Sequence, residues 1–348
     1  MFRPARCRRS LLRFLTAAVA ASACPVAARA DTVYFVSKDR GALYELNTAG
    51  GGITQLTGTN TFPDATALAI GPDGKLYIGD TTNGGSIRRY TVGGGVETVV
   101  TLSGANPAFA GGPVSPTAIA FTPGGAMLVG RNPVSAFSGY PSGQVLAVSG
   151  WAGNSPNVQD YTSGTSLAYQ TGLTVSPDGT LFASNTVYNI FASPPALIGD
   201  VVKFDGTGAF QAVVASGSAG VPGPAGLAVS GTMLFSASSM DGNIYKTDLA
   251  DLNPTTNTTL FASSGISNIG PLAMLADGSL LAGYVGGEQG QGNIFMFSTS
   301  GSLTSTFGGA EYGAIGGIAA VPEPTGLLLA VAGGAVWGLS RLCRRRRA

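Results

Sequence analysis

One unit, two short apolar strands joined by a tight turn, recurs along the middle of this chain of 348 residues. The turn is Pro-Asp-Gly at 72–74 and again at 177–179. Proline sets φ, aspartate binds the backbone of its own turn and glycine accepts a positive φ, so these aspartates have a structural role. Each copy has an aliphatic anchor in its first strand, and the anchors lie 51, 54, 54, 45 and 46 residues apart, which predicts a repeat fold. The anchors are Leu68, Ile119, Leu173, Leu227, Leu272 and Ile318.

Two more short strands follow each unit, for example Ser86–Tyr90 and Val96–Leu102. Four strands in every 45–54 residues, repeated about six times, are typical of a β-propeller. The ends of the repeat region complement each other, because Thr32–Ser37 matches the second strand of a unit and Ile315–Val321 supplies the missing first strand. We therefore expect an all-β, six-bladed propeller over residues 31–321, closed by its N- and C-terminal strands in one blade. A solenoid is the alternative, and it would leave this complementarity without a role.

The Gly-x-Ala-x core strands and the Pro-Asp-Gly turns resemble those of NHL and gluconolactonase/regucalcin-like propellers over nearly all of 31–321. The resemblance implies the fold. Gluconolactonase-like enzymes also hold a divalent cation in the central channel with Glu, Asn and Asp side chains, and an Asn commonly precedes the Gly-Leu of a core strand. Here Thr171 precedes Gly172 and Ala225 precedes Gly226, so no metal ligand is assigned from the resemblance.

Residues 1–30 have the pattern of a secretory signal. A basic stretch precedes the apolar run Leu15–Ala23, and Ala28 and Ala30 place small residues where signal peptidase requires them, so we expect cleavage after Ala30. The apolar run is far shorter than the about 20 residues of a membrane span. The pair Arg8-Arg9 also resembles a twin-arginine export motif, and the choice between the two export routes stays open.

The end of the chain, 322–348, carries a second targeting pattern. The motif Val321-Pro322-Glu323-Pro324 precedes an uncharged run over Thr325–Ser340. A helix of this length spans about 24 Å, enough to lodge in a bilayer with its flanking residues. Basic residues follow the run and would stay on the cytoplasmic side. They are Arg341, Arg344, Arg345, Arg346 and Arg347.

This three-part tail resembles the PEP-CTERM sorting signal of Gram-negative bacteria, with Pro322-Glu323-Pro324 as the signature. The resemblance implies recognition by an exosortase, a membrane transpeptidase, and transfer of the mature protein to the cell surface or its exopolysaccharide. A permanent single-span anchor is the alternative. Both interpretations place residues 31–321 outside the inner membrane, with contact to the membrane only through the C-terminal helix before processing.

Charge and composition exclude several function classes for residues 31–321. This region has eight basic and 17 acidic side chains, a net charge of −9, which argues against nucleic acid as a partner. The chain has no histidine, so histidine triads and histidine metal sites are excluded. Its cysteines, Cys7, Cys24 and Cys343, all lie in the flanks, which leaves the middle without a disulfide or a thiol nucleophile.

A candidate ligand face follows from the loop lengths, because the loops at 103–116, 132–142 and 186–198 are long and should gather on one face of the propeller. Aromatic residues in these loops are weak candidates for ligand contact: Phe109, Phe137, Tyr140, Tyr188 and Phe191. Three polar residues at second-strand ends should reach the same face: Asp80, Arg131 and Asn185. The alternatives are aromatic rings packed under their own loops and, for Asp80 and Asn185, either solvated loop residues or ligands of a hard cation.

We therefore expect a non-enzymatic binding or structural protein of the cell envelope, exported with the help of signal peptidase and an exosortase and associated with exopolysaccharide. No catalytic residue is assigned, and no cofactor is expected, although a divalent cation in the channel stays open. The alternative function is a metal-dependent hydrolase of the lactonase type. The sequence leaves the identity of the ligand undetermined.

Overall fold

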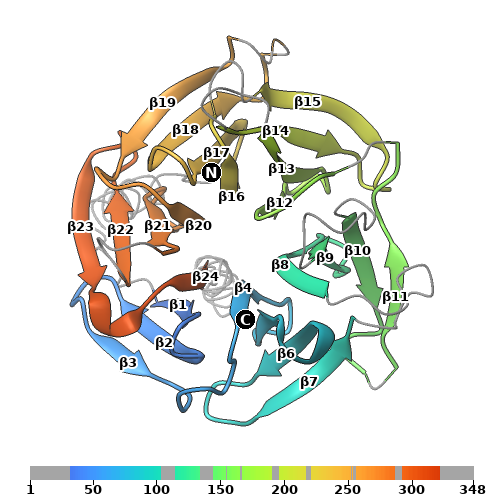
Figure 1. Cartoon of the computed structure of the whole chain (residues 1–348), viewed down its shortest axis with the longest axis vertical. Helices are drawn as coiled ribbons and strands as arrows, with labels where there is room; N and C mark the ends of the chain where they lie inside the picture. The colour runs from blue at the N-terminus through green and yellow to red at the C-terminus, as the bar shows by residue number, and fades with distance from the viewer. Residues whose placement is uncertain are drawn as a thin grey trace, which may run out of the picture. The chain divides into compact units, whose positions relative to one another are not determined.

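A computed structural model describes residues 32–102, 114–133, 144–153, 155–164, 167–189, 196–216, 221–251, 253, 256–286 and 292–321. Within these ranges the chain forms six antiparallel four-stranded sheets, which surround a central channel as the blades of a propeller (Figure 1). The predicted six-bladed architecture is confirmed. Each of the six anchors lies in the innermost strand of its blade, as the repeat spacing predicts.

The strands of each blade are numbered along the chain and are given from the channel outward. Blade 1 contains β24 (Ile315–Ala320), β1 (Thr32–Ser37), β2 (Ala42–Asn47) and β3 (Ile53–Gln55). Blade 2 contains β4 (Ala65–Ile70), β5 (Leu76–Asp80), β6 (Ser86–Tyr90) and β7 (Val96–Thr101). Blade 3 contains β8 (Val114–Phe121), β9 (Met127–Pro133), β10 (Gln144–Ser149) and β11 (Asn157–Asp160).

The second half of the ring follows the same order. Blade 4 contains β12 (Leu173–Val175), β13 (Leu181–Asn189), β14 (Ala196–Phe204) and β15 (Phe210–Ser216). Blade 5 contains β16 (Pro224–Ser230), β17 (Met233–Ser238), β18 (Asn243–Asp248) and β19 (Thr258–Ser263). Blade 6 contains β20 (Ile269–Met274), β21 (Leu280–Tyr284), β22 (Asn293–Phe297) and β23 (Leu303–Gly308). Short 3-10 helices are η2 (Thr82–Gly84) and η4 (Ala310–Tyr312).

Blade 1 closes the ring with strands from both ends of the described region. β24 pairs antiparallel with β1, and Ile318 lies opposite Phe35 in the register. The ladder continues past β24, because Val321 N–H donates to the Thr32 carbonyl at 3.0 Å. The predicted closure of one blade by N- and C-terminal strands is therefore confirmed.

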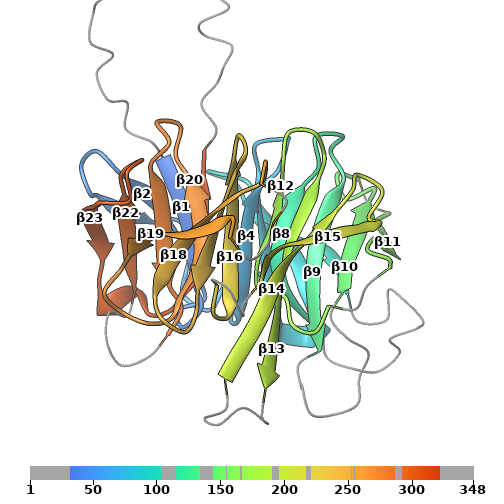
Figure 2. The same cartoon turned by 90° about the horizontal axis from the view of Figure 1, so that it is seen from above.

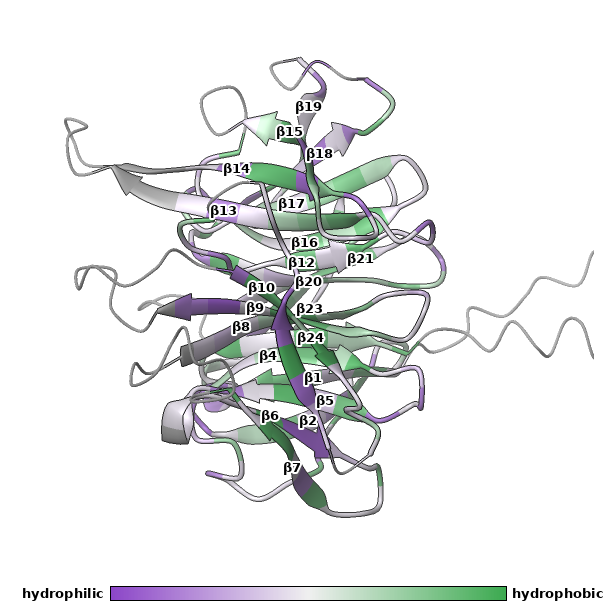
Figure 3. Ribbon diagram, turned by 90° about the vertical axis from the view of Figure 1, so that its right-hand side faces the viewer, coloured by the Kyte–Doolittle hydropathy of each residue, from purple (hydrophilic) through white to green (hydrophobic). Residues whose placement is uncertain are grey.

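The hydrophobic core lies between adjacent blades rather than in one central mass. The second strands supply much of it, and every residue of β5 and of β21 is buried. Between blades 1 and 6, Phe35 stacks on Tyr44 with ring centroids 5.0 Å apart, and the Tyr312 ring meets both edge-on. Figure 3 shows hydrophobic residues running through the strands and hydrophilic residues concentrated at turns and strand ends.

Alternation of strand direction gives the propeller two faces. The turn face carries the first–second and third–fourth turns, and the long-loop face carries the ends of the second strands and the starts of the first strands. The predicted loop at 186–198 is partly wrong, because β13 runs to Asn189 and β14 starts at Ala196, and this hairpin extends beyond the other blades (Figure 2). Thr186, Val187 and Tyr188 are β-branched or aromatic, which favours a longer strand here.

The two predicted targeting segments, 1–30 and 322–348, lie outside the described residues. The expected C-terminal helix over Thr325–Ser340 is therefore still a prediction. In the part of the chain that the structure describes, no helix has the length and apolarity needed to cross a membrane.

Candidate functional site: the central channel

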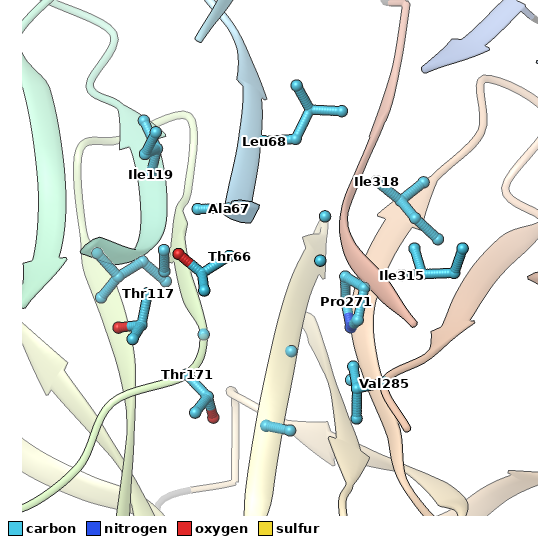
Figure 4. A pocket seen from close by; sticks show the side chains of 18 of the residues that line it. Thr66, Ala67, Leu68, Thr117, Ile119, Thr171, Pro271, Val285, Ile315 and Ile318 are labelled. Atoms are coloured by element: carbon cyan, nitrogen blue, oxygen red, sulfur yellow. The ribbon is translucent and has the colours of Figure 1, made fainter. Parts of the chain in front are cut away.

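The central channel holds a cavity of about 540 Å³ that the innermost strands of all six blades line. Three threonines occupy equivalent positions in neighbouring blades, Thr66, Thr117 and Thr171, each two residues before an anchor. Figure 4 shows them on one side of the channel, with Pro271 and Val285 across from them. The equivalent positions in blades 5, 6 and 1 are Ala225, Gly270 and Gly316. At these six positions the lining residues are therefore threonines on one side of the channel and small residues on the other.

Within the described ladders, β-bulges interrupt the inner strands of five blades at these positions. In β4, Ala65 pairs with Asp80 and Ala67 with Gly79, so Thr66 has no opposite residue in the register. As far as the structure describes the ladders, an equivalent shift interrupts the first–second strand pairing in blades 1, 2, 3, 5 and 6. A bulge inserts an extra residue and redirects its side chain, and bulges are enriched beside binding and active sites. The fold therefore builds the cavity wall from the extra residues of its inner strands.

The six anchors form the inner end of the cavity, and we call these six side chains the collar. Each is between 5% and 8% exposed, so all six present a similar small area to the channel. Residues closer to the turn face, such as Ala69 and Val229, are not among the described residues that line the cavity. The cavity thus extends from the long-loop face down to the collar.

The mouth of the cavity is polar and carries a single ion pair among the residues described. Lys38 Nζ lies 3.3 Å from Asp64 Oδ1, and both side chains are substantially exposed. The Thr81 hydroxyl donates to the Asp64 side chain and to its carbonyl. Exposed Tyr169, Thr186 within β13, and Ser239 and Val285 just beyond β17 and β21 complete the rim.

Asp80, a predicted candidate for the ligand face, lies inside blade 2. It is 1% exposed, and its Oδ1 accepts hydrogen bonds from the Thr82 N–H at 3.0 Å and from the Thr82 hydroxyl at 2.6 Å. Arg88 Nη1 lies 3.5 Å from Asp80 Oδ2, and the Arg88 guanidinium stacks over the Phe62 ring. The carboxylate is thus engaged within its own blade.

Arg131 and Asn185 were expected at strand ends, but they lie within β9 and β13, and both are engaged by the fold. Arg131 is buried, and this burial lowers the pKa of its guanidinium to about 10, while the Asp160 carboxylate acts in the opposite direction. The Asn185 side-chain oxygen accepts a hydrogen bond from the Ala168 N–H at 2.7 Å. Neither residue, nor Asp80, belongs to the described lining of the cavity, so the three do not come together there.

The predicted aromatic candidates for ligand contact are not among the residues whose side chains are described. Phe109, Phe137, Tyr140 and Phe191 lie outside the described residues, and only the backbone of Tyr188 is described, in β13. The processing and sorting residues Ala28, Ala30, Pro322, Glu323, Pro324, Arg341 and Arg344 to Arg347 also lie outside, whereas Val321 is the last described residue. Their roles stay predictions.

Sequence reasoning missed the residues that line the cavity. The signal was present in the repeats, because a threonine stands two positions before the anchor in three successive copies, at Thr66, Thr117 and Thr171. The register at the mouth is shifted by one residue from the prediction, since Thr81 and Thr186 line the cavity where Asp80 and Asn185 were expected. Successive residues of a strand point to opposite faces, so a shift of one residue changes the side on which a group lies.

The side chains at the cavity do not match a gluconolactonase-like cation site. Such a site needs several oxygen ligands from carboxylates and amides. Of the described residues that line the cavity, only Asp64 has a carboxylate, and it is paired with Lys38. Throughout the described ranges, no group of three or more His, Cys, Asp or Glu side chains is placed to hold a metal ion.

Comparisons with known proteins identify the architecture. No protein-family model matches the chain, and no curated protein matches its sequence. Among solved structures, it is similar to a chain in the crystal structure of a nidogen/laminin complex, with 14% identity and a TM-score of 0.64 over 84% of this chain and 98% of that one. It is also similar to a protein of unknown function from Bacteroides caccae, with 10% identity and a TM-score of 0.57 over 85% of this chain and 100% of that one. At these identities the likeness shows the fold alone, a six-bladed β-propeller.

Proposed function

We propose that this chain is an exported propeller that serves as a non-enzymatic binding or structural protein of the cell envelope, after sorting by an exosortase. The observation that carries the proposal is the position of the closing blade relative to the two targeting patterns. β1 begins at Thr32, two residues after Ala30, and the blade 1 ladder ends at Val321, directly before Pro322.

This arrangement separates processing from folding. The side chain of Val321 is 37% exposed, and the next hydrogen bond inward belongs to the β24–β1 ladder. Removal of 1–30 and of the residues after 321 would therefore leave every described strand intact. A sorting enzyme that cuts near Pro322 would release a closed ring rather than an opened one.

The same arrangement orients the protein before processing. Thr32 and Val321 lie at the turn face, because β1 begins and β24 ends there, whereas the cavity opens on the long-loop face. Four residue steps from Val321 to Thr325 span at most about 14 Å of extended chain. A propeller still held by its C-terminal segment would thus turn the cavity and the long loops away from the membrane.

The partner that we propose at the surface is a neutral exopolysaccharide. The net charge of −9 over 31–321 disfavours anionic polymers. Aromatic rings on long loops offer the flat apolar surfaces on which sugar rings stack. Binding through such a face would be weak for one copy and strengthened by the display of many copies.

Mass spectrometry of surface-released protein tests the sorting step. If an exosortase processes the chain, the mature form should yield peptides up to the region of Val321 and none that contain Arg344–Arg347. Recovery of these arginines in the mature surface protein would replace the proposal with a permanent anchor. The same spectra should begin at Asp31, which tests the expected signal cleavage.

The metal-dependent, lactonase-type alternative is tested by cation dependence. A channel cation that binds only the folded chain raises the melting temperature as its concentration rises above the dissociation constant. We expect calcium, magnesium or manganese to leave the melting temperature of chelator-treated protein unchanged. A saturable rise in the wild type that disappears in Asp64→Asn would favour the lactonase-type alternative, because Asp64 supplies the carboxylate at the cavity mouth.

A further inference from the structure

The hydroxyl groups of the cavity wall are already used within the fold. The Thr66 hydroxyl donates to the Pro116 carbonyl of the next blade at 2.6 Å. Thr171 and Thr186 both direct their hydroxyls to the Pro224 carbonyl, at 3.4 and 2.8 Å. Since each hydroxyl has one hydrogen to donate, these groups can offer a ligand only acceptor lone pairs. The wall therefore lacks the dense set of free donors that a sugar needs.

The interior of the cavity is also uncharged. Ser115 occupies the position equivalent to Asp64 at the mouth, and below it the described lining consists of Thr, Ala, Gly, Pro, Leu and Ile and ends at the collar. Lys38 and Asp64 lie at the mouth and neutralise each other. Transfer of an ion into such a lining without a paired charge is strongly unfavourable, whereas apolar surface is favourable there.

We propose that the cavity binds a small, uncharged organic molecule with a compact aliphatic or aromatic body. The molecule enters from the long-loop face and rests on the collar. The volume of about 540 Å³ lies within the range of small-molecule pockets, which are mostly apolar with a few placed polar groups. This site is separate from the proposed polysaccharide partner and does not depend on export or sorting.

Two dyes that differ in charge test the proposal on the purified full-length chain, in buffer without detergent micelles. N-phenyl-1-naphthylamine is neutral, and 1-anilinonaphthalene-8-sulfonate carries the same ring systems with a negative charge. We expect the neutral dye to bind at a single saturable site with a fluorescence increase. The dissociation constant of the sulfonate should be at least about tenfold higher than that of the neutral dye, because the lining offers it no counter-charge.

A matched pair of valine substitutions locates the site. Val285→Trp adds bulk at the mouth of the cavity, where Val285 is 38% exposed, so the fold should tolerate it. Val92→Trp makes the same change at a 50% exposed turn-face position. We expect Val285→Trp to raise the dissociation constant of the neutral dye about tenfold, through lost apolar burial, and Val92→Trp to leave it unchanged. Equal binding by the two variants, or no saturable binding by the wild type, would overturn the proposal.

Xenon gives a measurement that needs no substitution. Apolar cavities bind xenon, and its anomalous scattering locates it in a crystal. We expect a xenon site in the channel, in contact with collar residues such as Leu68 and Ile318. Crystals under xenon pressure that show no site against the collar would refute an apolar binding cavity, even if Val285→Trp failed to fold.

Discussion

At the scale of single residues, glycine allows the inner strands to approach one another around the channel. A Cβ on Gly172 would lie 2.1 Å from the Ala225 carbonyl oxygen, and one on Gly226 would lie 2.0 Å from that of Gly270. At Gly317, the equivalent position before Ile318, a Cβ would lie 2.5 Å from the Leu68 backbone nitrogen. These distances are far below any real van der Waals contact, so the Gly in the repeated Gly-Leu pattern is required by packing between blades.

The first prediction compares two glycines that both have ordinary φ. Gly226→Ala should lower the free energy of unfolding by about 1–3 kcal/mol or more, because backbone atoms must move to admit the methyl group. Gly124→Ala should change it by less than about 0.5 kcal/mol, since its nearest neighbour would be Thr122 Oγ1 at 3.8 Å. Urea denaturation measures both. Equal effects would mean that the ring relaxes around Gly226 at little cost.

Tyr77 shows how burial of one polar group makes stability depend on pH. Its side chain is fully buried, its ring meets Phe121 and Trp151 edge-on, and its hydroxyl donates to Asp73 Oδ2 at 3.1 Å. Desolvation is the largest cause that raises the pKa of Tyr77 to about 12. The Pro-Asp-Gly turn at Asp73 thus also holds a core tyrosine, in agreement with its expected structural role.

The second prediction follows from this shift. A folded-state pKa above the ordinary value of 10.0 means that the contribution of Tyr77 to stability is complete below pH 10. It is lost as the pH rises toward 12, because the unfolded chain ionises first. Between these pH values the free energy of unfolding should fall less steeply in Tyr77→Phe than in the wild type. Parallel curves for the two proteins would show that Tyr77 titrates normally.

At the scale of elements, the closing strand β24 and the bulged inner strands matter most. Ile315 and Ile318 on β24 are buried against blades 1 and 6, within a cluster that includes Phe35 and Leu281. Burial of two such side chains contributes about 1.5–3 kcal/mol each. The sum is comparable with a substantial part of the total stability of a domain, about 5–15 kcal/mol.

The third prediction concerns truncation at this strand. A chain that ends at Gly313 loses β24 and leaves both β1 and the neighbouring inner strands uncovered, so cooperative unfolding should disappear. A chain that ends at Pro322 keeps the ladder and should unfold like the full-length protein. Thermal melts followed by circular dichroism distinguish the two. Identical melting curves would contradict closure by β24.

At the scale of the whole molecule, the two faces have different structures. The turn face has short turns that aspartates cap, such as Asp178, whose Oδ1 accepts hydrogen bonds from the Thr180 N–H and the Ser176 hydroxyl. These hydrogen bonds lower the pKa of Asp178, and the one from the Ser176 hydroxyl has the largest effect. The long-loop face has the cavity mouth and the extended β13–β14 hairpin. Binding is therefore expected on the long-loop face.

The fourth prediction tests binding on the long-loop face. Tyr140→Ala combined with Phe191→Ala should lower retention of the protein on the matrix of the producing organism, because sugar rings lose their stacking surfaces. The melting temperature should stay unchanged if these rings are exposed. A lower melting temperature of the double variant would mean that the rings pack under their own loops. Unchanged retention by a folded double variant would remove these two aromatic residues as the binding site.

Local patterns in the sequence were sufficient for the number of blades, the inner-strand anchors and most strand positions. Strands expected at Thr32–Ser37 and Ser86–Tyr90 occur with those bounds. The reason is that alternation of apolar residues, turn chemistry and repeat length are all encoded within a few tens of residues. Closure was also predictable, because a missing first strand at one end matches an extra strand at the other.

The contents of the channel were decided by tertiary structure. A bulge in the inner strand of most blades lies at Thr66 or its equivalents, and the residue that lines the mouth is Thr81 rather than Asp80. The alternation of apolar residues does not mark this bulge, although the threonine that recurs two positions before the anchor is visible in the repeats. Strand parity then determines which side chain enters the cavity and which pairs inside its blade. The sequence by itself thus determined the ring and its repeats, and only the packing between blades determined the chemistry of the channel.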